Sequence, residues 1–299
     1  MAYTSGDTIL DDHYNDFATS VNAIWGSGSG DSGYGQTNTV SSVSAGATIT
    51  ASQWSTLLAR ITSAASHQNS SITSITSPSA GDTIAAYTAL SGNITTITNN
   101  KLNVHARDSV VESNCSTTTT LTGTIEQRGT WTWGSEDQAR YFFNAGGRLS
   151  VRWDISSFTS DDKANNWNAL ASNCGTYQIV AQSSGKSGGG GSANINDTNK
   201  GWHDLTGSYQ TVFRQYEDSA PYTASYIMLE LYKSGADVLF RSKWVDDAAD
   251  QTSYNKNIYN VMDQVDGTKQ TFFGHEEPTT THIADTWGDG PTQTVNANG

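Results

Sequence analysis

The chain has 299 residues and a net charge of -13 at pH 7, and 15% of its residues are charged while 35% are hydrophobic. This length allows two domains with cores of their own, and the acidic charge, which no Lys/Arg cluster reverses, argues against nucleic-acid binding. No apolar run approaches the ~18 residues that a membrane span needs, and the N-terminal sequence has no signal-peptide pattern. We therefore expect a protein that is made in the cytoplasm and is not inserted into a membrane.

The first hundred residues carry an internal repeat that predicts three short helices. The sequence Gly-Asp-Thr-Ile, or its variant Ala-Thr-Ile, ends at Ile9, Ile49 and Ile84. Each copy precedes apolar residues that are three to five positions apart, and this spacing lays one apolar stripe along a helix. Asp11 and Asp12 would complement the dipole of the first helix. The threonines of the three copies are the predicted N-caps: Thr8, Thr48 and Thr83.

The three predicted helices would form a thin bundle. Their apolar stripes are narrow and bordered by Ser, Thr and Asn, and the glycine-rich segment 26–35 between the first two helices is expected to be a flexible loop. We therefore expect this region to complete its burial against copies of itself or against a partner subunit. The alternative is that the helices pack on the C-terminal part of the same chain.

After the polar segment 101–113, the pattern changes to strands. Residues 149–155 alternate between apolar and polar, which is typical of a half-buried strand, and Gly146-Gly147 before them suggests a hairpin. One helix, at 163–173, interrupts the strands. The predicted strands are 120–127, 130–133, 140–143, 147–155, 177–182, 210–214, 226–233, 236–244, 257–265 and 268–273.

These elements predict an α+β fold that is mainly β. It consists of a short-helix N-terminal region followed by an antiparallel β-sandwich domain with one packed helix. The predicted domains are a helical repeat region at 1–105 for anchoring or oligomerisation, the β-sandwich at 106–286, and a polar C-terminal arm at 287–299.

No residue pattern indicates catalysis or cofactor binding. Cys115 and Cys174 have no neighbouring His in the sequence, so we expect two buried free thiols rather than a nucleophile or a disulfide framework. Gly185-Lys186-Ser187 lacks the preceding glycine of a phosphate-binding loop. We therefore expect no enzyme; a depolymerase remains a third hypothesis, because it needs only two carboxylates that face each other in the fold.

Two groups of side chains offer metal ligands, but neither has the spacing of a known metal site. The first group is His275, Glu276, Glu277, His282 and Asp285. The second group is Asp246, Asp247 and Asp250. Because the regular ligand spacing of zinc and calcium sites is missing, we expect solvated loops at both places and no bound metal.

Tryptophans are the main candidates for contacts with a ligand. The chain has 9 Trp and 13 Tyr against 8 Phe, and amphipathic rings suit interfaces. Trp153 and Trp244 lie on alternating strands and are expected in the core. Trp131 and Trp133 share one face of a strand, and Trp202 lies in a polar loop, so these three are the predicted surface contacts.

Two sets of residues resemble those of a known group of proteins. The repeated Gly-Asp-Thr-Ile that leads into a helix, with the related residues 49–57, resembles N-terminal segments of virion structural proteins of tailed bacteriophages, marine ones above all. Residues 141–148, 166–170, 205–213 and 221–227 are similar to a β-rich domain of phage tail-associated proteins. The resemblance implies a virion component, in the tail or its appendages, and it transfers no catalytic residues.

The primary hypothesis is a structural component of a phage virion, a tail, neck or fibre subunit that self-assembles through its N-terminal region and presents the β-domain. The expected location is the virion, and the expected partners are other virion proteins and copies of the chain, without nucleic acid. The alternative is a host-receptor or glycan-binding module of the tail, which the Trp and Tyr content favours.

Overall fold

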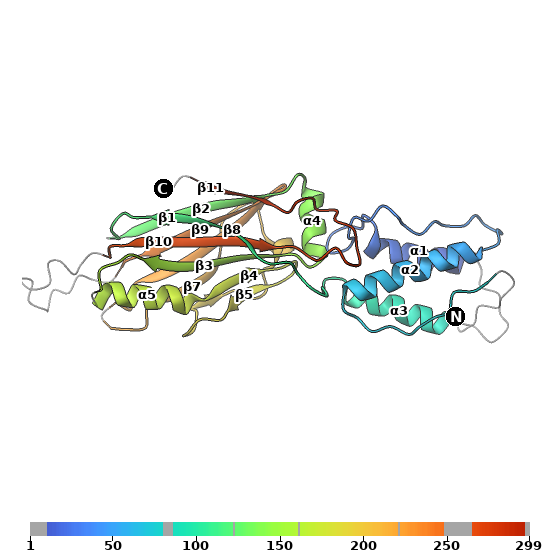
Figure 1. The fold of residues 1–299 in the computed structure, drawn as a ribbon, viewed down its shortest axis with the longest axis horizontal. Helices are drawn as coiled ribbons and strands as arrows, with labels where there is room; N and C mark the ends of the chain where they lie inside the picture. The colour runs from blue at the N-terminus through green and yellow to red at the C-terminus, as the bar shows by residue number, and fades with distance from the viewer. Residues whose placement is uncertain are drawn as a thin grey trace, which may run out of the picture. The chain divides into compact units, whose positions relative to one another are not determined.

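The structure is a computed structural model that describes residues 11–79, 86–121, 123–160, 162–220, 222–247 and 265–296. It has the predicted α+β fold, which is mainly β (Figure 1). The chain divides into two compact units. The helical unit comprises Met1–Asp108, Arg140–Gly147 and Glu277–Gly288, and the sandwich unit comprises Ser109–Ala139, Arg148–Glu276 and Asp289–Gly299. The units therefore differ from the contiguous domains that we expected.

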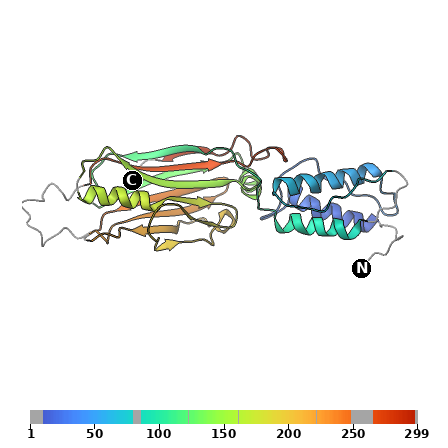
Figure 2. The same cartoon turned by 60° about the horizontal axis from the view of Figure 1, so that its bottom comes forward.

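Three helices form the centre of the helical unit: α1 (Asp11–Trp25), α2 (Ala51–His67) and α3 (Tyr87–Asn99). They lie side by side (Figure 2), and their apolar stripes are buried, as predicted. Tyr14 of α1 packs edge-on against Trp54 of α2, with ring centroids 5.6 Å apart. Asp11 and Asp12 lie in the first turn of α1, where their charges complement the helix dipole.

The N-cap of α2 differs from the predicted one. Thr50 takes this role instead of Thr48: its hydroxyl accepts a hydrogen bond from the Gln53 N–H at 3.3 Å, and Gln53 Oε1 accepts one from the Thr50 N–H at 2.8 Å. This reciprocal capping box needs a Gln or Glu three residues after the cap, and the corresponding residue for Thr48 is an alanine. The predicted caps Thr8 and Thr83 lie outside the described residues.

Asparagine side chains attach coil segments to the helices. Asn15 of α1 donates to Val43 O at 3.0 Å and accepts from Val43 N at 2.8 Å, and Asn22 makes both bonds with Val40 at 2.8 Å. Asn93 of α3 holds a residue of the segment after α2 in the same way. Each amide satisfies one N–H and one C=O of the coil, so the coil can bury Val40 and Val43.

The helical bundle has a fuller core than the sequence suggested. Besides the helix stripes, the unit buries Tyr34, Phe142 and Phe143 with no exposed area, and Trp287 is only 1% exposed. These residues come from segments that lie far from the helices in the sequence. Segments 140–147 and 277–288 of the same chain therefore add to the core of the helical unit, which agrees with the alternative that the helices pack on the C-terminal part of this chain.

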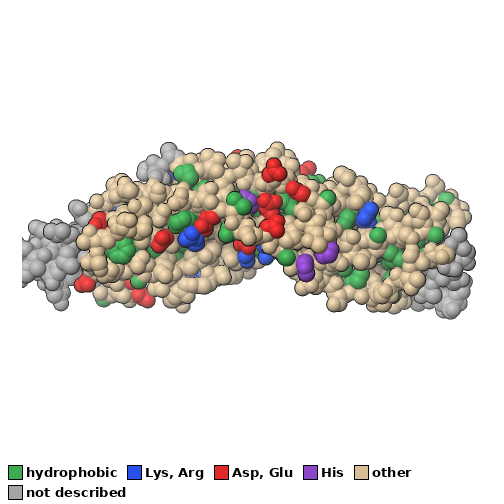
Figure 3. Space-filling view, viewed as in Figure 1, with side chains coloured by type: hydrophobic (Ala, Val, Ile, Leu, Met, Phe, Trp, Pro, Cys, Tyr) green, Lys and Arg blue, Asp and Glu red, His purple; other side chains and the backbone are tan. Residues whose placement is uncertain are grey.

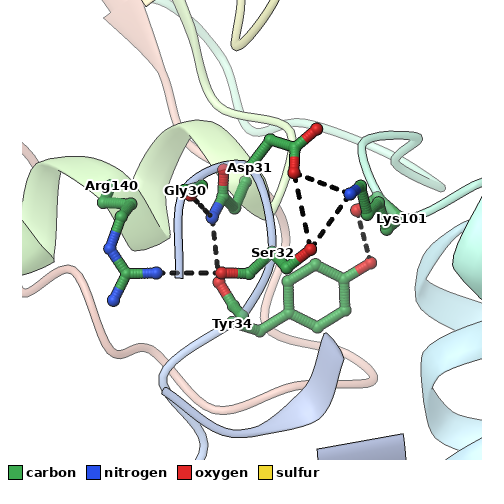
Figure 4. A network of polar contacts seen from close by, with 8 residues as sticks. Gly30, Asp31, Ser32, Tyr34, Lys101 and Arg140 are labelled. Atoms are coloured by element: carbon green, nitrogen blue, oxygen red, sulfur yellow. Dashed lines mark hydrogen bonds and ion pairs between the residues drawn. The ribbon is translucent and has the colours of Figure 1, made fainter. Parts of the chain in front are cut away.

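The glycine-rich segment 26–35 is a packed loop rather than the flexible loop that we expected. Lys101 donates to Asp31 Oδ1 at 2.7 Å and to Ser32 Oγ at 3.0 Å, and Arg140 donates to Ser32 O at 2.9 Å (Figure 4). The buried Tyr34 hydroxyl donates to Lys101 O at 2.6 Å. These bonds attach the loop to two other segments of the helical unit.

The sandwich unit contains two antiparallel sheets, with strand orders β1-β10-β3-β4-β5 and β11-β2-β9-β8-β7-β6. A short 3-10 helix, η1 (Trp202–Asp204), precedes β7. The strands are β1 (Val111–Thr117), β2 (Thr124–Thr132), β3 (Arg148–Ser156), β4 (Thr176–Ile179), β5 (Ser184–Ser187), β6 (Ile195–Asn196), β7 (Gln210–Tyr216), β8 (Tyr226–Ser234), β9 (Asp237–Val245), β10 (Thr268–Glu276) and β11 (Thr292–Asn296).

Residues 140–143, which we predicted to be a strand, belong to helix α4 (Glu136–Asn144). The Ser135 hydroxyl accepts from the Gln138 N–H at 3.1 Å, and two acidic residues stand in the first turn. These helix-start signals outweigh the short apolar run that suggested a strand. The predicted hairpin at Gly146-Gly147 is therefore wrong, because these glycines join α4 to β3.

Most other predicted elements of the sandwich are confirmed, including the helix, α5 (Asp162–Cys174), which packs on β3. The strands predicted at 120–127 and 130–133 form one strand, β2, and β1, β5, β6 and β11 were not predicted. Of the strand predicted at 257–265, only Val265 is described.

The segment 287–299 is not a polar arm as predicted. Trp287 is buried in the helical unit, and β11 pairs antiparallel with β2 at the edge of the six-stranded sheet. A strand at a sheet edge pairs through its backbone, so it needs no apolar alternation, and this is the reason why the sequence pattern did not reveal it.

A buried polar network joins the two sheets. Gln127 Oε1 accepts from the Thr271 hydroxyl at 2.6 Å and from Trp244 Nε1 at 3.2 Å. Trp153 Nε1 donates to Ser242 Oγ at 2.8 Å, which lies 3.0 Å from the Thr271 hydroxyl. Trp153 and Trp244 are 4% and 0% exposed, so their predicted place in the core is confirmed.

Candidate interaction surface

The three tryptophans that we predicted as surface contacts are interior residues. Trp131, Trp133 and Trp202 are 0%, 2% and 2% exposed. Trp131 packs against Phe240 and Phe273, with ring centroids 5.3 and 5.5 Å away. Trp131 lies on the inner face of β2, and Trp133, which directly follows the strand, is buried as well. A covered ring cannot stack on a sugar, so this prediction is wrong.

The two cysteines are free and buried, as expected. Burial raises the pKa of Cys115 to about 12 and raises the pKa of Cys174 further above its ordinary value. The thiolate is the reactive form of cysteine, and both thiols stay protonated at neutral pH. Their role in the described structure is packing.

The residues that could have bound a metal are dispersed. Within the described part of the chain, no three His, Cys, Asp or Glu side chains come together in a way that could hold a metal ion. Asp246 forms a buried ion pair with Lys163 at 2.6 Å, and Asp250 lies outside the described residues. The first candidate group is divided between the two units, His275 and Glu276 in one and Glu277, His282 and Asp285 in the other.

The outer face of the six-stranded sheet carries a group of tyrosines. In β8, Ile227, Leu229 and Leu231 point inward with no exposed area, so Tyr226 and Tyr232 point outward. Their rings contact two tyrosines of the neighbouring segment, with centroids 5.0 and 4.5 Å apart. We define the tyrosine–arginine face by six residues of this surface: Tyr209, Arg214, Tyr216, Tyr226, Tyr232 and Arg241.

A carboxylate lies between two cations next to these tyrosines. Glu230 Oε2 is 2.6 Å from Arg241 Nε and 3.2 Å from Lys243 Nζ. Burial by itself would raise the pKa of Glu230, but the hydrogen bonds from Arg241 and Lys243 outweigh it, and the pKa is lower than usual. The Arg241 guanidinium also lies 4.3 Å from the centroid of the Tyr209 ring. Glu230 therefore remains ionised and holds these cations in place.

Arg214 is different from every other described cation. Its guanidinium lies 5.2 Å from the ring centroid of Tyr216 and 5.7 Å from that of Tyr226, and its buried Nε has no hydrogen-bond partner. Every other Lys and Arg in the described ranges has a carboxylate or carbonyl acceptor. Arg214 has none among the described residues, so its positive charge is available to an anion from outside the chain.

The sequence pattern predicted the strands that carry this face, but the aromatic residues predicted as surface contacts lie elsewhere, in the interior. The signal was present in β8, because the residues that alternate with Ile227, Leu229 and Leu231 include Tyr226 and Tyr232. The unpaired state of Arg214 had no signal in the sequence, since it depends on which acidic residues the fold brings near it.

None of the helices in the described ranges is long and apolar enough to cross a membrane. No protein-family model, no curated protein and no solved structure gives a match to this chain.

Proposed function

We propose that the chain is a structural component of a phage virion, most simply a tail, neck or fibre subunit. The resemblance of its repeated N-terminal segments and of its β-rich domain to tail-associated proteins supports this role. Its proposed location is the virion, and its proposed partners are other virion proteins and further copies of the chain.

The observation that carries the proposal is that buried His and Lys side chains donate hydrogen bonds to backbone carbonyls of the fold. His67 Nε2 donates to Ala145 O at 2.8 Å, and Lys269 Nζ donates to the carbonyls of Gly267 at 2.8 Å and Val265 at 3.1 Å. Histidine and lysine side chains act in catalysis when they lie in a cleft and their pKa values are perturbed. Here they satisfy backbone carbonyls, which supports a structural role.

The surface composition also supports this role. On the face drawn in Figure 3, apolar side chains are scattered among atoms of other types, while several Asp and Glu side chains lie close together. Only 15% of the residues are charged, and such a composition suits a protein that is exposed on a particle. The apolar stripes of the helices are buried within the helical unit and are not left open to another copy. A surface of the sandwich unit is therefore the better candidate for the proposed self-assembly.

A second candidate function is recognition of a host receptor or glycan. The observation that favours it is the group of partly exposed tyrosines beside arginines on the sandwich, since rings and guanidinium groups are common in recognition surfaces. The predicted Trp131, Trp133 and Trp202 are buried and take no part in this candidate.

Purified phage particles test the primary proposal. An antibody against the chain, used in immunogold electron microscopy together with mass spectrometry of the particles, is expected to mark the tail, neck or fibres. If the chain is abundant in infected cells but missing from purified particles, the proposal is wrong. Binding of labelled protein to host cells tests the second candidate, and an absence of binding would remove it.

A further inference from the structure

We propose that the tyrosine–arginine face binds an acidic surface of a second copy of this chain, and that Arg214 is the residue that receives a carboxylate of that copy. The inference rests on the proposed structural role and names the surface through which the subunits would associate.

The surroundings of Arg214 favour the binding of an anion. Its guanidinium lies over the rings of Tyr216 and Tyr226, which restrict its motion, and no described residue neutralises it. An arginine stacked on aromatic rings keeps the edge of its guanidinium available, and this edge matches a carboxylate through two parallel hydrogen bonds. A partner that supplies a carboxylate would therefore satisfy a cation that the fold leaves without an acceptor.

Charge complementarity identifies the second copy as the partner. On this surface the four cations Arg128, Arg214, Arg241 and Lys243 outnumber the three carboxylates Glu126, Glu230 and Asp237. The whole chain nevertheless has 29 acidic and only 16 basic residues, so the rest of each copy is strongly acidic. A locally basic surface on an acidic protein attracts the acidic parts of its own copies, while two basic surfaces repel one another.

The residue types fit a protein interface. Tyr and Arg are enriched where binding energy is concentrated, and tyrosine orders few rotatable bonds on binding. The rings already contact each other in two pairs, Tyr209 with Tyr232 at a centroid distance of 4.5 Å and Tyr216 with Tyr226 at 5.0 Å. Because the basic face meets a different, acidic surface, the contact is heterologous, and contacts of this type build rings or filaments.

Sedimentation velocity of the full chain over a range of concentrations tests the inference with two matched variants. Arg214→Gln removes one positive charge from this face. Arg152→Gln removes one from the outer face of the other sheet, where Arg152 also lies over a ring, that of Phe272, at 3.7 Å. We expect the wild-type chain to associate, Arg214→Gln to weaken association about tenfold or more, and Arg152→Gln to change it less than about threefold. Thermal unfolding of both variants serves as the control for folding.

Three results would overturn the inference. The first is a wild-type chain that remains monomeric at every concentration, and the second is an equal effect of the two variants. The third is a monomeric chain that binds heparin, an acidic polysaccharide, through Arg214, because the face would then belong to the glycan-binding candidate. If particles contain the chain but Arg214→Gln does not affect association, the proposed function stands and only this surface is wrong.

Discussion

In the helical unit, side-chain amides hold the coil segments, whereas in the sandwich unit the strands hold one another through their backbones. Asn15, Asn22 and Asn93 each supply both a donor and an acceptor to one coil residue. In the sandwich, buried polar side chains such as Gln127 join the two sheets instead. The difference teaches that polar residues beside a helix stripe can belong to the interior, where they satisfy backbone groups that no sheet satisfies.

The largest expected effect is in the core of the sandwich. Trp131→Ala should lower the free energy of unfolding by about 3–5 kcal/mol, because it empties the space between Phe240 and Phe273. Urea denaturation of the full chain measures this change. The control is Tyr232→Ala on the outer face, which should cost about 1 kcal/mol. Equal losses for the two variants would contradict the inner position of Trp131.

Acid should destabilise both units, because each contains a buried neutral histidine. Burial lowers the pKa of His67 and of His275 to about 4, and at His67 burial outweighs the hydrogen bond to Ala145 O, which acts in the opposite direction. Since an unfolded histidine has a pKa of about 6.5, the unfolded state binds the proton more tightly. The full stability is thus present above pH 6.5 and is lost as the pH falls from 6.5 to 4, by about 2 kcal/mol per histidine at pH 5.

Urea denaturation at pH 7.5 and pH 5 measures this acid sensitivity. His67→Gln should abolish the part of the acid-induced loss of stability that arises in the helical unit, because glutamine does not titrate. His275→Gln should abolish the part that arises in the sandwich unit. A wild-type stability that is the same at both pH values would show that these histidines are not buried in the neutral form.

A smaller effect distinguishes the asparagines that hold coil from those that face solvent. Asn93→Ala removes two bonds of 2.8 Å to Thr73 and leaves a backbone N–H and C=O without partners, which should cost about 1–2 kcal/mol. Asn99, exposed near the end of the same helix, is the matched control, and its replacement by alanine should be close to neutral. The comparison of the two units fails if both substitutions have the same effect on urea denaturation.

The smallest effect concerns the start of α2. Thr50→Ala removes the capping hydroxyl and should cost about 1 kcal/mol, while Thr48→Ala, two residues earlier, should leave stability unchanged. Thermal unfolding of the two variants measures the difference. A larger loss for Thr48→Ala would restore the N-cap that the sequence suggested.

The regular elements could largely be predicted, but the site could not. The apolar stripe around Trp54 and the alternation along 149–155 indicated a helix and a strand, and both are present. The prediction failed at 140–143, because it gave a short apolar run more weight than the cap at Ser135. It also failed at Trp131, because the alternation along a strand does not show which of its two faces is buried. In both cases the sequence pattern was compatible with two arrangements.

The sequence by itself determined most of the helices and strands, because periodicity depends on residues that are neighbours in the chain. Only the tertiary structure decided that 140–147 and 277–288 complete the helical unit, that asparagines hold its coil, and that Arg214 has no acceptor among the described residues. The physical reason is that burial and charge pairing depend on segments that meet only after folding. Contacts between distant segments leave no local pattern in the sequence.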